Sequence, residues 1–540
     1  MNSCKQRPRA ESLRFSLRAA LLLSISLTAS AQSVQHLSVP QPGGLPGQPI
    51  LTGVIPWTNG VSVTWDGPAG YYQLFEKSSL TDPSWRALGP RTNLVRRAWV
   101  PGATTAALFR VSGPAPHYVG SQACLECHQT IHDGLMGTLH AQAFTALKQT
   151  QQDNNPSCLP CHTVGFGKPS GFSSAAATPQ LEGVQCESCH GPAGNHAANP
   201  DDPTSRPRVE IASTVCGGCH AEIIGPHSFA GVAPHPPTYE EWKSSPHSSV
   251  VEDMNPTNRI DSCGRCHSGT ARWTMLEGKP LPAGDANLGI QCINCHEPHS
   301  KTANPHQLYN PLASTNDYSI TTSGTLAAQY NPYINVCAQC HNHRGASWTS
   351  SSRAPHHSPQ YNLLIGTVGL LDSGAPPHQP GSHALRIQNQ CVGCHMQSTN
   401  SVNGAQPATS GHTFQVQAYD TCLACHPLPE QLAHFTQSAI SNQVQTIKAA
   451  LDLWAVTKAP QALSAKYGTR AWEYSTPGDL SPGGPGPSSA EQTQIPVNIQ
   501  KARFNLYLVL YDGSFGVHNG PFTVTLLDTA ETWVDQELSQ

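Results

Sequence analysis

The pentapeptide CLECH at residues 124–128 is the first of nine copies of one short pattern. In every copy two residues separate a pair of cysteines, and a histidine follows the second cysteine directly. The copies are CLECH (Cys124, Cys127, His128), CLPCH (Cys158, Cys161, His162), CESCH (Cys186, Cys189, His190), CGGCH (Cys216, Cys219, His220), CGRCH (Cys263, Cys266, His267), CINCH (Cys292, Cys295, His296), CAQCH (Cys337, Cys340, His341), CVGCH (Cys391, Cys394, His395) and CLACH (Cys422, Cys425, His426). The 540-residue chain contains 19 cysteines, and only Cys4 lies outside these copies.

C-x-x-C-H is the attachment sequence of c-type haem, in which two thiols bond to one porphyrin and the adjacent histidine ligates the iron. Pairs of C-x-x-C type also bind zinc, and exported proteins pair their cysteines as disulfides. Neither alternative requires a histidine directly after every second cysteine. The sequence therefore predicts nine covalently attached c haems, packed closely enough for the macrocycles themselves to form much of the core.

The second axial ligand of most irons is predicted to be histidine. Only five methionines occur in the chain, against 27 histidines, of which the motifs use nine. Methionine ligation raises the potential of a haem. Its scarcity therefore predicts mostly bis-histidine haems with comparatively low potentials.

The composition and the N-terminus indicate an exported protein without an affinity for nucleic acid. Charged residues make up 12% of the chain and the formal net charge is −4, so there is no basic excess. Residues 1–18 carry five basic residues and one acid, residues 19–27 are apolar, and Ala29-Ser30-Ala31 is a cleavage signature. We therefore expect a signal peptide over residues 1–31, and a periplasmic, extracellular or outer-membrane-associated protein of a Gram-negative-type bacterium. The apolar run is too short to span a bilayer, and no later stretch is predicted to span one.

Three further domains are expected from the distribution of cysteine. Residues 33–116 resemble a small fibronectin- or immunoglobulin-like β-sandwich, with strand candidates at 61–65, 71–75, 94–100 and 106–111. Gly67-Pro68 and Gly89-Pro90 are predicted to be turns. Residues 117–434 hold every motif and should be mostly loop and α-helix around stacked haems, since the chain contains 45 glycines and 47 prolines.

A helical C-terminal region over residues 435–540 is expected to pack on the haem domain. One helix face is formed by residues spaced by three or four, which are Ile440, Val444, Ile447, Leu451 and Trp454, and Pro460 should end that helix. Residues 497–511 are a second helix candidate. A third begins at Pro521, and its apolar face consists of Leu526, Leu527, Ala530, Trp533 and Val534.

Several strings around the motifs are similar to those of the cytochrome c-552/c-554-like multihaem cytochromes. They are YVGS (118–121), TLHA (138–141), CHTVGFG (161–167), LEGVQCESCHGPAGNH (181–196), TYEEWKSSPH (238–247), RAPHHSPQ (353–360) and GHTF (411–414). The segment at 502–519 resembles the terminal helical region of the wider superfamily, which includes multihaem nitrite reductases and hydroxylamine oxidoreductases. The resemblance covers about residues 117–530.

The resemblance implies nine distal ligands for the nine haems. They are His140, His196, His235, His247, His299, His356, His383, His412 and His518. His357 competes with His356. Other histidines of the same region stay open as alternatives, which are His117, His132, His227, His306, His343, His378 and His434.

Three functions are compatible with these features. The first is an electron carrier that meets redox-protein partners as donor and acceptor. The second is an oxidoreductase acting on a small nitrogen or sulfur compound at one haem with an open distal face. The third is a structural surface assembly, in which the β domain mediates oligomerisation. The resembling ammonia-forming nitrite reductases attach their active haem at C-x-x-C-K, and no such motif occurs here. We therefore expect a carrier rather than a catalyst.

Overall fold

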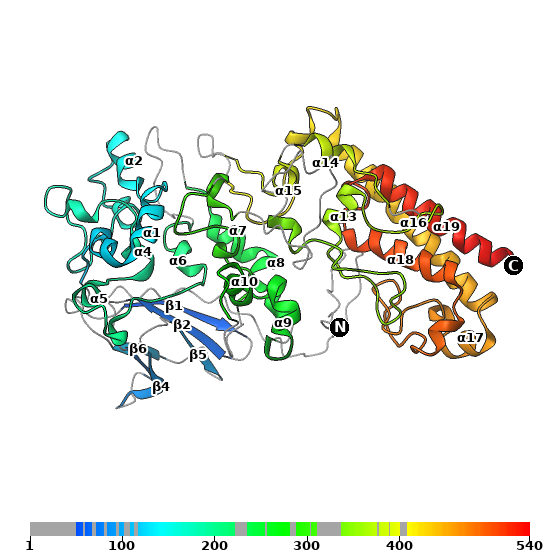
Figure 1. The fold of residues 1–540 in the computed structure, drawn as a ribbon, viewed down its shortest axis with the longest axis horizontal. Helices are drawn as coiled ribbons and strands as arrows, with labels where there is room; N and C mark the ends of the chain where they lie inside the picture. The colour runs from blue at the N-terminus through cyan, green and yellow to red at the C-terminus, as the bar shows by residue number, and fades with distance from the viewer. Residues whose placement is uncertain are drawn as a thin grey trace, which may run out of the picture. The chain divides into compact units, whose positions relative to one another are not determined.

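The computed structural model describes residues 50–57, 60–66, 72–79, 84–92, 97–101, 108–112, 117–221, 235–253, 256–280, 288–302, 304–309, 336–374, 377–387, 389–399 and 408–540. The chain divides into two compact units, with the boundary between Glu210 and Ile211. Strands are confined to the first part of the first unit, and the described residues beyond it form helices and loops (Figure 1).

Within the described residues, six strands form two antiparallel sheets of three strands each. The strands are β1 (Ile50–Trp57), β2 (Gly60–Asp66), β3 (Tyr72–Lys77), β4 (Arg86–Thr92), β5 (Arg97–Pro101) and β6 (Leu108–Ser112). The order is β1-β2-β5 in one sheet and β4-β3-β6 in the other. Alternate residues of β2, Val61 and Val63, pack with Leu74 and Val100 in one buried cluster, so the two sheets share a core. This arrangement confirms the small two-sheet region expected from the alternation at 61–65.

The sequence did not predict β1 or β4. Gly89-Pro90, expected as a turn, lies inside β4. The pairing of β3 with β4 changes register between Tyr72 and Leu74, and Gly89 has a φ of 61°. A glycine with positive φ at an irregular pairing is typical of a bulge, which explains why a turn signal occurs within a strand. Gly67-Pro68 lies outside the described residues.

The rest of the first unit consists of short helices and loops. The helices are η1 (Ser121–Cys124), α1 (Leu125–Met136), α2 (Ala143–Gln149), α3 (Leu159–His162), η2 (Pro179–Leu181), α4 (Cys186–His190), α5 (Gly194–Ala198) and η3 (Pro203–Ser205). The buried carboxylate of Glu187 holds the loops together, because it accepts hydrogen bonds from the backbone amides of Val119, Gly120 and Ala193. Buried backbone groups need such partners where regular structure is sparse.

The first part of the second unit also consists of short helices and loops. Its short helices are α6 (Thr214–Gly217), α7 (Thr238–Ser244), α8 (Pro246–Ser249), η4 (Val250–Asp253), α9 (Pro256–His267), α10 (Gly269–Leu276), η5 (Cys292–Asn294), η6 (Pro305–Gln307), α13 (Gln360–Ile365), α14 (Ser382–Arg386), α15 (Gln390–His395) and η8 (Asp420–Cys422). The apolar clusters among these elements are small, as in the cluster of Ala338, Tyr361, Leu364, Ile365 and Ala384. Protein side chains alone supply little core here.

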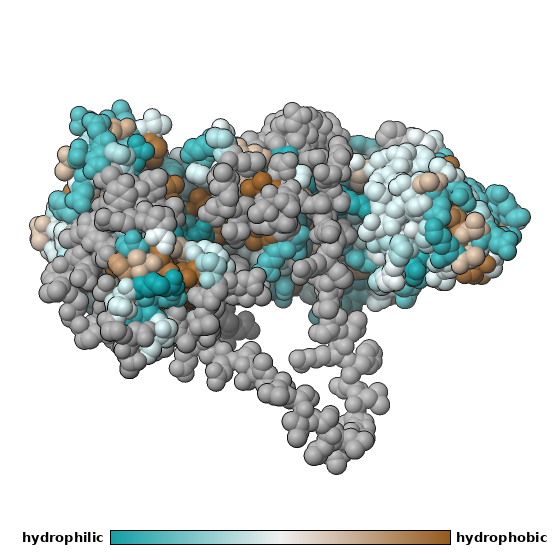
Figure 2. Space-filling model, turned by 90° about the horizontal axis from the view of Figure 1, so that it is seen from below, coloured by the Kyte–Doolittle hydropathy of each residue, from teal (hydrophilic) through white to brown (hydrophobic). Residues whose placement is uncertain are grey.

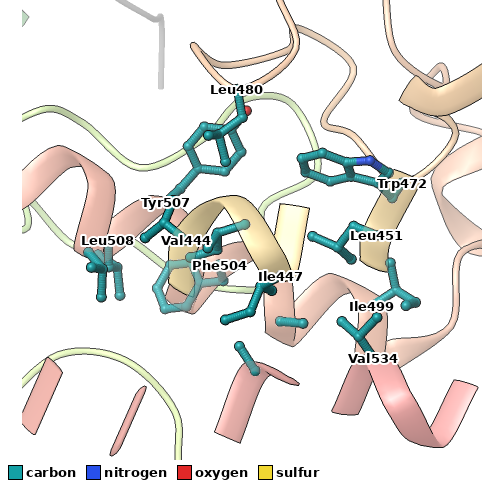
Figure 3. Close-up of a cluster of buried hydrophobic side chains, with 14 of the residues drawn as sticks. Val444, Ile447, Leu451, Trp472, Leu480, Ile499, Phe504, Tyr507, Leu508 and Val534 are labelled. Atoms are coloured by element: carbon teal, nitrogen blue, oxygen red, sulfur yellow. The ribbon is translucent and has the colours of Figure 1, made fainter. Parts of the chain in front are cut away.

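The C-terminal region contains the largest apolar core. Its helices are α16 (Pro429–Thr457), α17 (Gln461–Tyr467), η9 (Gly468–Arg470), η10 (Glu491–Gln494), α18 (Val497–Asp512) and α19 (Gly520–Ser539), and the long helices α16, α18 and α19 lie side by side (Figure 1). The predicted face of α16 is buried from Ile440 to Trp454. Figure 3 shows Val444, Ile447 and Leu451 of this face among side chains of the neighbouring segments. The helix begins six residues before residue 435, at Pro429.

The outer surface of this helical region is mainly hydrophilic or of neutral hydropathy on the face drawn in Figure 2. Leu453 and Val456 of α16 are exposed apolar side chains. None of the helices in the described ranges is long and apolar enough to cross a membrane.

Candidate haem sites

Each motif adopts a tight helical turn that groups its three functional side chains. The histidine amide donates to the carbonyl of the first cysteine over 2.9 Å at His220, His341 and His426. Residues three and four apart lie on one side of such a turn. The two thiols and the imidazole of a motif therefore point to the same side, which is the arrangement that two-point attachment to one planar ring requires.

Thiols of different motifs lie within interaction distance of one another. In the first unit the interaction with Cys186 raises the pKa of Cys124, and the same interaction lowers the pKa of Cys186. In the second unit Cys216 lowers the pKa of Cys292 to about 7. Motifs separated by many residues in the chain are thus neighbours in space.

Two more contacts extend this connection in the second unit. Cys266 lowers the pKa of Cys340 to about 5, and Cys391 raises the pKa of Cys337. Because Cys337 and Cys340 belong to one motif, these contacts join three motifs. The motifs that these contacts join are therefore not isolated sites.

In the described part of the chain, at least six motif histidines face a second histidine at nearly constant separation. The ring centres are 6.5 Å apart for His128 and His196, 5.9 Å for His267 and His356, 6.2 Å for His296 and His412, 6.0 Å for His341 and His247, 6.2 Å for His395 and His518, and 6.1 Å for His426 and His383. A metal–imidazole bond is about 2 Å long, so two imidazoles on opposite sides of one metal have ring centres roughly 6 Å apart. The residues present therefore fit a bis-histidine iron, and the second member of every pair is a histidine nominated from the sequence.

Backbone carbonyls orient several motif histidines and nominated histidines. The Nδ1–H of His190 donates to the carbonyl of Arg208 over 2.7 Å, and that of His296 donates to the carbonyl of His306 over 2.7 Å. His383 donates in the same way to Val517 over 2.8 Å. An imidazole fixed through Nδ1 presents Nε2 to a metal, and the acceptor sets both the tautomer and the ring plane.

Burial favours the neutral form that a metal needs at several of the paired histidines. Burial lowers the pKa of His247 to about 3 and that of His412 to about 4. Burial also lowers the pKa values of His296 and His395. His518 differs, because the charge and hydrogen bond of Asp512 outweigh the effect of burial and raise its pKa.

The three other nominated histidines are His140, His235 and His299. The amide of Val184 donates to the carbonyl of His140, and the amide of the adjacent Gly183 donates to the carbonyl of the motif histidine His162. His140 therefore lies near His162. His235 is exposed just before α7, and Nδ1 of His299 lies 3.5 Å from a carboxylate oxygen of Glu297.

The first unit contains three motif histidines but only two nominated partners, His140 and His196. His117 and His132 belong to this unit too, and His132 is buried with its Nδ1 3.1 Å from Asp133. The alternative histidine His227 lies outside the described residues.

Sequence reasoning missed two carboxylates that support nominated histidines. Asp512 accepts a hydrogen bond from Nδ1 of His518 over 2.7 Å. Glu241 accepts from the amides of Ser410 and His412, and so fastens α7 to the segment that carries His412. Both acids lie inside sequence segments that carry the family resemblance. The sequence of such a segment does not show which distant groups its side chains contact in the fold.

Comparison with known proteins agrees with this geometry. Residues 123–191 match the family model described as cytochrome c554 and c-prime. The chain is 28% identical over 173 residues to cytochrome c-554 of Nitrosomonas europaea, a match that covers 25% of this chain and 73% of that protein. It is 25% identical over 286 residues to the multiheme cytochrome MtrA of Shewanella baltica, covering 45% of this chain and 76% of that one.

Among solved structures, the chain is similar to the outer cell wall cytochrome OcwA, with a TM-score of 0.49 and 19% identity over 77% of this chain and 99% of the other. The motifs, their geometry and the sequence relatives define a multihaem c-type cytochrome, which binds haem c covalently. Within that class the chain is similar to the cytochrome c-554-like family, through residues 123–191 and through the match to cytochrome c-554.

Proposed function

We propose that this protein is an exported nonahaem cytochrome that transfers electrons between redox-protein partners along its own chain of haems. The observation that carries the proposal is the contact between thiols of different motifs, at Cys124–Cys186, Cys216–Cys292, Cys266–Cys340 and Cys337–Cys391. A porphyrin is bonded directly to each of these sulfur atoms when haem is attached. Rings attached through thiols that interact in this way would lie close together, which favours rapid electron hopping.

The paired histidines support a carrier rather than a catalyst at six of the sites. We propose that each pair, from His128–His196 to His426–His383, supplies both axial ligands of one iron. An iron with two protein ligands has no vacant position for a small substrate. For the motif histidines His162, His190 and His220 we retain His140, His235 and His299 as proposed ligands, with His117 and His132 as alternatives in the first unit.

The proposed domain arrangement follows the sequence. It consists of a signal peptide (1–31), a small β domain (33–116), a nine-haem domain (117–434) and a helical C-terminal region (435–540). We propose a periplasmic, extracellular or outer-membrane-associated location, as the predicted export signal suggests. The low density of charge favours partners that dock at an exposed haem edge with modest electrostatic steering.

Stopped-flow spectroscopy of the purified holoprotein tests this function. A strong reductant should reduce all haems rapidly, and a second redox protein of higher potential should then oxidise them. Nitrite, hydroxylamine and tetrathionate should show little turnover under the same conditions. Robust turnover of one of these compounds, accompanied by a high-spin haem that binds cyanide, would instead assign the protein to the oxidoreductases.

A further inference from the structure

Asp512 differs in charge from the backbone carbonyls that orient several other paired histidines. Neutral carbonyl oxygens accept the Nδ1–H of His267, His296 and His395, at Val250, His306 and Phe414 respectively. The Nδ1–H of His518 instead donates to the carboxylate Oδ1 of Asp512 over 2.7 Å. The imidazole opposite His395 is thus held by a negative charge.

The position of this carboxylate is fixed and nearly dry. The Asp512 side chain is only 3% exposed. Its second oxygen, Oδ2, accepts hydrogen bonds from the hydroxyl and the amide of Ser514, and the Ser514 hydroxyl accepts from the amide of His518. Gly513, with a φ of 72°, ends α18 and turns the chain back, so that His518 returns to the residue that orients it. The hydrogen bond is therefore built into the end of the helix.

We propose that Asp512, acting through His518, lowers the reduction potential of the haem attached at Cys391 and Cys394. This inference rests on the proposed ligation of that haem by His395 and His518. A carboxylate partner increases the electron donation of an imidazole to its metal. The oxidised iron carries one more positive charge than the reduced iron, so a buried negative charge nearby stabilises the oxidised form, and low polarity strengthens this effect. Asp512 is therefore a positioning residue that also tunes the potential.

The position of this haem gives the tuning a consequence for electron flow. Cys391 contacts Cys337 of the preceding motif, and Cys394 lies near Cys422 of the following motif. A low potential at this site places an uphill step between the haems of those two motifs. Electrons would accumulate on one side of the step, and the haem at Cys422 and Cys425 would equilibrate slowly with the rest of the chain.

The variant Asp512→Asn tests the proposal because asparagine keeps an oxygen for the Nδ1–H but removes the charge. Redox titration of the holoprotein followed by EPR should show one low-spin haem moving to higher potential, with the others unchanged. The matched control is Asp253→Asn. Oδ2 of Asp253 lies 4.0 Å from Nδ1 of His267, on a half-exposed carboxylate, while that Nδ1–H donates to Val250. The Asp253→Asn variant should shift the reduction potentials of the haems much less than Asp512→Asn.

A second variant keeps the proposal testable if Asp512→Asn disturbs folding. Ser514→Ala removes a hydrogen bond from Oδ2 and leaves more negative charge on the carboxylate that faces His518. It should move the same haem to lower potential, the opposite direction.

Three results would overturn the tuning. They are unchanged potentials in both variants, an equal shift in Asp253→Asn, or a high-spin haem in Asp512→Asn, which would limit Asp512 to a structural role. The variant His518→Ala separates failure of the ligation itself. If every haem stays low-spin in that variant, His518 is not a ligand and the proposed ligand set is wrong at this site.

Discussion

Glu473 is a carboxylate enclosed in the C-terminal core, and its ionisation should govern the pH dependence of stability there. Its side chain is fully buried, its Oε1 accepts from the Tyr507 hydroxyl over 2.5 Å, and the amide of Tyr474 donates to its Oε2 over 3.0 Å. Burial raises its pKa from 4.5 to about 7. Between these values the folded protein binds a proton that the unfolded chain has released. Stability therefore falls as pH rises through this range, by about 3 kcal/mol in all.

The variant Glu473→Gln should flatten this dependence because glutamine is neutral at every pH. Denaturant midpoints from far-UV circular dichroism at pH 5 and pH 8 should differ less for the variant than for the natural protein. Asp535→Asn, at an exposed position of α19, is the control and should leave the slope as it was. An unchanged slope in Glu473→Gln would show that this carboxyl does not titrate across the range.

At the scale of single residues, the sequence predicts a haem motif because all of its functional groups lie within five residues. It does not predict the groups that orient the histidines, because these come from distant parts of the chain. Two thiols and a histidine within five residues identify a haem motif, whatever the rest of the chain does. The carbonyl that orients the histidine comes from elsewhere, as with Arg208 for His190 or Val250 for His267. The family resemblance nominated His518. The contact of His518 with Asp512 could not be predicted, because it forms only when the chain turns back after the end of α18.

At the scale of elements, helix α16 offers a matched pair of leucines. Leu451 is completely buried, whereas Leu453, two residues later, is 50% exposed. Leu451→Ala should reduce the free energy of unfolding of the C-terminal region by about 2–5 kcal/mol, since it leaves a cavity in a packed core. Leu453→Ala should change it by less than about 0.5 kcal/mol. Equal effects in denaturant titrations would contradict the assignment of the buried face.

Helix α7 makes a second test possible, because Glu241 fastens it to the segment that carries His412. Glu241→Ala removes the acceptor of these hydrogen bonds and should loosen His412. If His412 is the ligand opposite His296, low-temperature EPR should show up to one haem becoming partly high-spin. The control is Glu240→Ala, at the exposed neighbouring position. A fully low-spin spectrum for Glu241→Ala would mean that the clamp does not hold a ligand.

Hydrophobic periodicity predicted the C-terminal helices, which pack against other protein side chains. It did not predict strand β4, whose pairing with β3 is irregular. The face from Ile440 to Trp454 and the helix from Val497 are found because a packed apolar core requires a 3.6-residue period. Strand β4 was missed because Gly89-Pro90 produces a turn signal inside an irregular pairing. The short helices of the motif regions have little periodicity, since the partner that they would pack against is a porphyrin rather than another helix.

At the scale of the whole molecule, the division of the core explains the sequence composition. Apolar side chains build the C-terminal core, which includes Leu363 of α13, and the other clusters among the described residues from α6 to α15 are small. Covalently held macrocycles can supply the missing apolar volume between short helices. On this reasoning the haem-bearing segments fold fully only after attachment, and the total number of haems is a structural quantity as well as a functional one.

The haem count is therefore the most direct prediction for the whole molecule. The mature holoprotein should gain the mass of nine haems in intact mass spectrometry, because nine motifs each provide two thiols, and it should retain haem stain after denaturation. The double variant Cys422→Ser with Cys425→Ser, in the last motif, should lose the mass of one haem and leave eight attached. The control is Thr457→Ser, at an exposed position of α16 outside every motif, which should keep all nine. Bound zinc or free thiols at the motif cysteines would contradict covalent attachment, and a different haem number would identify motifs that remain empty.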